Sequence, residues 1–179
     1  MDILNTLGHF TPSEIKLFEQ HTRVKRIERN QTVLNEGEIC RSFYYILSGS
    51  FIQYRMVDID EVITDLHLKD EWMYNHQSLI NQTLSLHRIK AFNQSEVLEL
   101  TLENYHFLLS SSLAFVQLNK ILDQDNHRTF LFDHNLSPAD RYLYLQKTKP
   151  DAVKIFPVKS IASYLKIAPE TLSRIRAKR

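Results

Sequence analysis

The chain has 179 residues, a net charge of +1 and a hydrophobic content of 43%, which suits one large or two small packed domains and excludes a disordered chain. No run approaches the roughly 20 apolar residues of a membrane span, and the early residues lack the basic and then apolar layout of a signal peptide. The single cysteine, Cys40, excludes an internal disulfide and a metal centre built on several thiolates, so we expect a cytoplasmic protein with no cofactor and no membrane contact.

The first half of the sequence predicts a short helix followed by a series of strands. Thr11 is suited to cap a helix that begins at Pro12. Residues 24–58 are rich in Val, Ile, Phe and Tyr and are interrupted at Gly37 and Gly49, where glycine adopts a positive φ at little cost. Further strand-like segments follow, so we expect a sandwich or barrel of short strands.

After the strands the hydrophobic period becomes helical, and residues 109–134 predict one long helix. Its residues recur at spacings of three and four, as the a and d positions of a coiled coil do. We therefore expect a dimer interface built from Phe115, Leu118, Leu122, Asp125 and Thr129. An amphipathic helix packed on its own domain has the same spacing and is the alternative.

The charge is distributed unevenly along the chain. Residues 136–179 contain ten Lys and Arg against three Asp and Glu, a net charge of +7, whereas the remainder has twelve basic and eighteen acidic residues, a net charge of −6. A basic tail on a mildly acidic body is typical of a nucleic-acid-binding protein.

The basic tail contains the segment "VKSIASYLKIAPETLSRIR", which predicts two short helices joined by a tight turn. Ile161 and Leu165 share one face of the first helix. The second helix restarts at Pro169 and has Leu172 and Ile175 as its buried stripe. This is the pattern of a helix-turn-helix, and the hydroxyls and arginines at the outward positions suit a DNA groove. An ordinary helical hairpin with a basic exterior is the structural alternative.

Two segments of the chain resemble the bacterial Crp/Fnr transcription regulators. "IASYLKIAPETLSRIR" resembles that family's recognition segment, and "LNEGEICRSFYYILSGSFIQYR" resembles its β-roll signature. The resemblance implies an α+β protein with an N-terminal double-stranded β-helix (a β-roll or jelly roll) of the cyclic-nucleotide-binding type over residues 1–108. A dimerisation helix over residues 109–134 and a helix-turn-helix domain over residues 135–179 would follow. It also implies a homodimer that binds a near-palindromic operator in double-stranded DNA.

The resemblance assigns the base-reading roles of the family to Glu170 and Arg174, because Glu accepts a hydrogen bond from cytosine and Arg donates to guanine. Pro169 stands where the family often has a basic residue. Lys166 stands at the usual glycine of the turn, which requires a strained or a changed turn. The DNA contacts we expect are Lys159, Ser160, Pro169, Glu170, Thr171, Ser173, Arg174, Arg176 and Lys178.

The expected ligand pocket departs from the pattern of cyclic-nucleotide-binding relatives, which hold the phosphate with a Gly-Glu pair and a later Arg-Ser pair. Tyr74-Asn75 and Ser85-Leu86 take those places, and Arg88 is shifted along its strand and is expected to face elsewhere. A buried phosphate without its arginine is poorly tolerated, so we predict no useful affinity for cyclic AMP. The residues Trp72, Tyr74, Asn75, His76, Ser85 and Leu86 either fill this degenerate pocket or form a site for a different, less anionic effector.

Two other classes of protein share some of these sequence features. A cupin-type metal enzyme needs converging histidines, but the eight histidines include no His-x-His pair. No phosphate loop or nucleophile elbow appears either, so we expect neither an enzyme nor a metal site. Haem held by His67 or His76 stays open. The second class is a ligand-sensing or interaction module without DNA binding, which Pro169 and the short C-terminus favour and the basic tail opposes.

Overall fold

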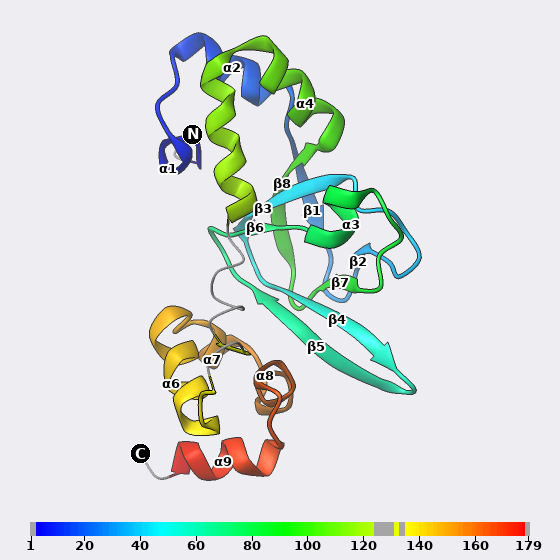
Figure 1. The fold of residues 1–179 in the computed structure, drawn as a ribbon, viewed down its shortest axis with the longest axis vertical. Helices are drawn as coiled ribbons and strands as arrows, with labels where there is room; N and C mark the ends of the chain where they lie inside the picture. The colour runs from blue at the N-terminus through cyan, green and yellow to red at the C-terminus, as the bar shows by residue number, and fades with distance from the viewer. Residues whose placement is uncertain (1–2, 124–130, 133–134, 178–179) are drawn as a thin grey trace.

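The computed structural model describes residues 3–123, 131–132 and 135–177 of the chain. Two four-stranded antiparallel sheets form a β-roll, with helices at one end and a separate group of helices that carries the C-terminus (Figure 1). This arrangement confirms the predicted α+β class. Within the described residues, no helix is long and apolar enough to span a membrane.

The strands of the β-roll alternate between its two sheets. One sheet has the order β1-β8-β3-β6 and the other has the order β2-β7-β4-β5, so β5 is an edge strand. The strands are β1 (Arg23–Ile27), β2 (Thr32–Leu34), β3 (Ser42–Ser48), β4 (Phe51–Val57), β5 (Asp60–His67), β6 (Trp72–Met73), β7 (Arg88–Ala91) and β8 (Ser95–Thr101).

The helices precede, interrupt and follow the strands. Those packed with the β-roll are α1 (Ile3–Leu7), α2 (Pro12–Gln20), α3 (His76–Asn81), α4 (Leu102–Ser111) and the 3-10 helix η1 (Leu113–Asp123). The C-terminal group consists of α6 (Pro138–Thr148), α7 (Ala152–Ile155), α8 (Val158–Leu165) and α9 (Pro169–Ala177).

Local sequence signals set several of these boundaries as predicted. The Thr11 hydroxyl accepts a hydrogen bond from the backbone N–H of Glu14, and the Glu14 carboxylate accepts one from the N–H of Thr11, which completes a capping box at the start of α2. Gly49 joins β3 to β4 with a φ of +91°. A side chain there would also collide with Ser95, so both conformation and space require glycine.

Two hydrophobic cores lie on either side of β4. The first fills the roll and includes Phe51, whereas Ile52 and Tyr54 belong to the second core, between this sheet and the C-terminal helices. Successive residues of a strand point to opposite faces. The run "FIQY" in β4 is therefore buried throughout because the roll covers one face and the C-terminal helices cover the other.

The helix predicted to form the dimer interface packs differently from that expectation. Phe115 and Leu118 are fully buried in the chain's own first core, and Leu122 packs against it. In this conformation the three side chains pack within their own chain, as the alternative of an amphipathic helix packed on its own domain describes, and the dimer interface built from them stays a prediction. Asp125 and Thr129 lie outside the described residues. Spacing identifies an apolar face but does not specify what covers it.

Candidate DNA-reading surface and sensor site

The two terminal helices form the predicted helix-turn-helix. Ile161, Leu165 and Leu172 are fully buried between them and the neighbouring helices, and α9 begins at Pro169 as expected. The backbone N–H of Ile167 donates to the carbonyl of Ala162, and the N–H of Lys166 donates to that of Ser163. These two bonds are those of a Schellman motif, which ends a helix at a left-handed residue.

Lys166 occupies that left-handed position, with a φ of 55° and a ψ of 47°. The turn is therefore unchanged and the lysine adopts the strained conformation, one of the two outcomes that the missing glycine allowed. A residue other than glycine in this region costs about 1–2 kcal/mol. The strain is confined to Lys166, and the rest of the turn keeps its hydrogen bonds.

The second helix presents its polar residues to solvent. Glu170 and Arg174 are exposed and lie four residues apart on one face of α9. The expected contacts that are exposed are Lys159, Pro169, Glu170, Ser173, Arg174 and Arg176, while Ser160 and Thr171 are half-buried and Lys178 lies outside the described residues. The structure thus places a carboxylate acceptor and a guanidinium cation on one exposed face of α9.

The C-terminal helices are attached to the β-roll by polar contacts as well as by the second core. The N–H of Ile63 on the edge strand β5 donates to the hydroxyl of Ser163 on α8 over 2.9 Å. The Lys149 ammonium donates to the carbonyl oxygen of Leu66 and to the Glu71 carboxylate, both over 2.9 Å. These contacts fix α8, and with it α9, against the open edge of the sheet.

The charge on Lys149 is stabilised by its neighbours. Burial opposes the charged form, but the carboxylates of Asp65 and Glu71 outweigh it and raise the pKa of Lys149 above its ordinary value. The amino group is therefore a cation bound between the two domains. The contacts of Lys149 and Ser163 could not be predicted from the sequence, because no local pattern shows which strand a distant side chain will meet.

In the sensor region, the chain's own side chains occupy the places of the Gly-Glu pair. The Tyr74 hydroxyl donates to the backbone carbonyl of Ile121 over 2.9 Å, and its ring contacts Phe43 edge-on. Asn75 is buried, and its side chain caps the short helix α3 by accepting from the N–H of Ser78. Neither residue presents a free backbone loop to a phosphate.

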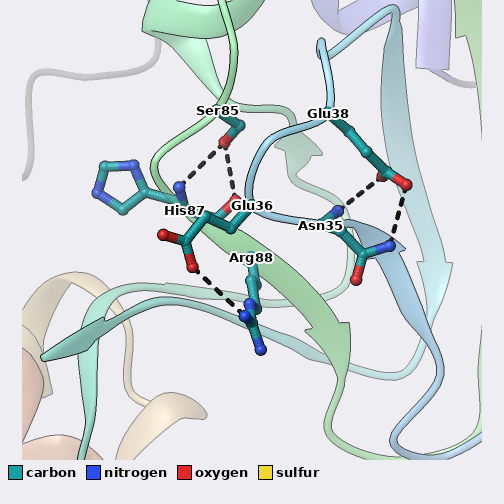
Figure 2. Close-up of polar contacts among 6 residues, drawn as sticks. All are labelled: Asn35, Glu36, Glu38, Ser85, His87 and Arg88. Carbon is teal, nitrogen blue, oxygen red and sulfur yellow. Dashed lines mark hydrogen bonds and ion pairs between the residues drawn. The ribbon is translucent and has the colours of Figure 1, made fainter. Parts of the chain in front are cut away.

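The place of the Arg-Ser pair is occupied by a loop bonded to itself (Figure 2). The buried Ser85 hydroxyl donates to the carbonyl of His87 over 2.8 Å and accepts from the N–H of the same residue. The Ser85 N–H and carbonyl pair with the backbone of Glu38 and Gly37. The serine therefore has its polar groups satisfied within the protein.

The other residues of the degenerate pocket separate into buried and exposed ones. Trp72 is buried in the first core, whereas His76 and Leu86 are exposed, so filling of the pocket, one of the two alternatives, does not describe these two residues. Arg88 faces away from the roll, as expected: its neighbour Ile89 is buried in the first core, and the Arg88 guanidinium pairs with Glu36 over 3.4 Å (Figure 2). Arg88 thus pairs with a carboxylate on the outside of the roll.

Comparisons with known proteins agree with this architecture. Residues 24–112 match the family described as the cyclic nucleotide-binding domain. Among curated proteins, no sequence matches the chain. FixK2 from Bradyrhizobium japonicum is similar in structure, with a TM-score of 0.65 and 14% identity over 88% of this chain and 83% of that one.

Two further solved structures cover nearly the whole chain. A cyclic nucleotide-binding domain-containing protein from Listeria monocytogenes has a TM-score of 0.67 and 14% identity, covering 98% of this chain and 89% of its own. The c-di-GMP-responsive global regulator CLP from Xanthomonas campestris has a TM-score of 0.61 and 21% identity, covering 94% and 91%. At these identities the likeness shows the fold. Residues 24–112 therefore match the cyclic nucleotide-binding domain, and the chain as a whole shares the fold of these solved structures.

Proposed function

We propose that the chain is a DNA-binding transcription regulator of the Crp/Fnr type, acting without catalysis and without response to cyclic AMP. The observation that carries the proposal is the helix-turn-helix itself, with its second helix exposing Glu170 and Arg174 on one face. The charge of the chain supports it, because residues 136–179 have a net charge of +7 and a basic region supplies the affinity for phosphates that every DNA-binding protein needs.

Glu170 and Arg174 are suited to read bases. An arginine donates two hydrogen bonds to a guanine edge in the major groove, and a glutamate accepts one from the amino group of cytosine. The N-terminus of α9 adds free N–H groups that favour a nearby phosphate. Pro169 removes only an N–H that has no partner within the helix at this position, so it is compatible with this role.

A homodimer is part of the proposal, through a face other than the one predicted from spacing. Leu113 and Val116 on η1 are 89% and 49% exposed, whereas Phe115 and Leu118 are buried. Two recognition helices related by a two-fold axis would enter successive major grooves about 34 Å apart, so the operator should be a near-palindrome.

The absence of a cyclic AMP response follows from the sensor region. Ser85 is hydrogen-bonded within its own loop and Arg88 is paired with Glu36. A phosphate placed in the roll would have no arginine to balance its charge, and burial of an unpaired anion is costly.

The first experiment is selection of bound sequences from a random DNA duplex pool by the full chain, with and without cyclic AMP. We expect an enriched near-palindrome whose enrichment is unchanged by the nucleotide. Enrichment that requires cyclic AMP would contradict the closed sensor site. Absence of enrichment in both arms would count against DNA reading and favour an interaction module.

Arg174→Ala should weaken binding to the selected duplex by about 1–3 kcal/mol per half-site and relax the preference at one base-pair position. Fluorescence anisotropy against a set of singly substituted duplexes measures both effects. Arg29→Ala, an exposed cation just after β1, is the matched control and should have little effect. An equal loss on every duplex would make Arg174 a phosphate contact.

A further inference from the structure

A cavity of about 230 Å³ lies where the C-terminal helices meet the β-roll. The roll contributes Arg55 from β4, Thr64 from β5 and His87, which directly precedes β7. The other wall is formed by Phe132, by Tyr164 of α8 and by Lys166 in the turn of the helix-turn-helix. The cavity therefore has one wall from each domain.

The charged lining of this cavity is basic. Arg55 and Lys166 are both exposed and form no ion pair with a described residue. No acidic side chain of the described residues lines the cavity. Two cations drawn from separate domains to one small space attract an anion and repel a cation.

Thr64 adds a buried polar group that has no hydrogen-bond partner among the described residues. Its side chain belongs to a residue that is 9% exposed, and its hydroxyl forms no hydrogen bond with any described residue. Thr64 is also the extra residue of a β-bulge, because Gln53 pairs with Asp65 whereas the next residue, Tyr54, pairs with Ile63. Bulges redirect a side chain, and a buried hydroxyl without a partner destabilises the fold unless a ligand or water supplies one.

Lys166 supplies a second observation, independent of Thr64, that points to a ligand in this cavity. It is held in the left-handed conformation that glycine adopts more easily, and its ammonium lies 4.0 Å from the centre of the Phe132 ring. A strained residue other than glycine points to a role for its side chain. Glycine at this position would give the same turn without strain but would remove the only charge that the turn contributes to the cavity.

We propose that this cavity binds a small organic anion, a carboxylate on an aromatic or branched apolar body. The carboxylate is held by Arg55 and Lys166 and accepts a hydrogen bond from the Thr64 hydroxyl. Its apolar body packs on Phe132 and Tyr164, whose rings are 6.4 Å apart and nearly perpendicular. At about 230 Å³ the cavity lies below the roughly 300–1,000 Å³ of pockets for drug-sized ligands, so the ligand is smaller than a nucleotide.

Binding here would connect the sensor domain directly to the recognition helix. A ligand that contacts both Arg55 of the β-roll and Lys166 of the turn stabilises the placement of α8 and α9 in which both contacts exist. The size of this effect equals the difference in the ligand's binding free energy between that placement and any other. This regulatory consequence rests on the proposed DNA binding, whereas the binding site itself does not.

The test is isothermal titration calorimetry of the full chain with benzoate, with its neutral analogue benzamide and with cyclic AMP. We expect saturable binding of benzoate, binding of benzamide at least tenfold weaker, and no saturation by cyclic AMP. Absence of benzoate binding, or equal affinity for benzamide, would overturn the proposal. Saturable binding of cyclic AMP in competition with benzoate would overturn the conclusion that the ligand is smaller than a nucleotide.

Three variants locate the site. Lys166→Gly keeps the turn and Arg55→Gln keeps most of the side chain, and each should weaken benzoate at least tenfold. Lys69→Gln removes an exposed cation of the β-roll outside the cavity lining and should leave the affinity unchanged. Thr64→Val should weaken benzoate while leaving the thermal midpoint unchanged or raised, because it removes an unsatisfied hydroxyl. Benzoate binding that survives both charge removals would place the ligand elsewhere.

Anisotropy with the selected duplex, with and without benzoate, then separates the two proposals. Benzoate binding without any DNA binding would overturn the regulator and keep the anion site. DNA binding with no benzoate binding would overturn the anion site and keep the regulator.

Discussion

Phe115→Ala is expected to lower the free energy of unfolding by about 3–5 kcal/mol, the range for an aromatic side chain removed from a packed core. Phe115 is fully buried in the first core, and its ring lies 5.6 Å from that of Phe10. In a chain of 179 residues such a loss lowers the thermal midpoint by roughly 6–20 °C. Thermal unfolding followed by circular dichroism measures it.

The neighbouring residue provides the control. Val116, the next residue of η1, is 49% exposed, so Val116→Ala should change the free energy of unfolding by less than about 1 kcal/mol. Size-exclusion chromatography with light scattering on both variants tests the dimer face. A Phe115→Ala protein that keeps its thermal midpoint but dissociates into monomers would restore the interface predicted from spacing.

Lys149→Met is expected to destabilise the chain by about 2 kcal/mol, because it leaves the Leu66 carbonyl and the Glu71 carboxylate without the charged donor that joins them. Methionine keeps the length and apolar character of the side-chain stem, so the loss of stability measures the contribution of the ammonium group. The thermal midpoint should fall by roughly 4–8 °C. Hydrogen exchange should increase most in α6 and α8, since Lys149 follows α6 and anchors it to the roll.

Lys154→Met is the matched control for this variant. Lys154 pairs with Asp151 over the same 2.9 Å, but both side chains are largely exposed, and such pairs contribute about 0.5 kcal/mol or less. Equal effects of the two substitutions would mean that the buried contact does not hold the domains together.

The dependence of the Lys149 effect on pH has a definite sign. Its pKa in the folded chain is raised above the ordinary value of 10.5, so its contribution is fully present below that pH and is lost as the pH rises through the folded-state pKa. The difference in stability between the wild type and Lys149→Met should therefore stay constant between about pH 7 and 9 and decrease only in stronger alkali.

The N-terminal caps, the glycine turns and the order of elements could be predicted because each depends on residues close together in the chain. Thr11 and Glu14 complete a capping box through contacts three residues apart, and Gly49 has the positive φ that its turn requires. The helix-turn-helix was equally local, since its apolar stripe and its break at Pro169 lie within one segment.

The amino-acid sequence by itself thus determined the fold class, the two terminal helices with their tight turn, and the presence of Ser85-Leu86 where relatives have an Arg-Ser pair. Only the tertiary structure decided which face of η1 is covered, that Lys149 bonds to Leu66 and Glu71, and that Arg55, Thr64 and Lys166 surround one cavity. The physical reason is the range of the interactions: backbone conformation and capping depend on neighbours within a turn or two. Burial and partner choice depend instead on residues roughly 80 to 110 positions apart, which only the folded chain brings together.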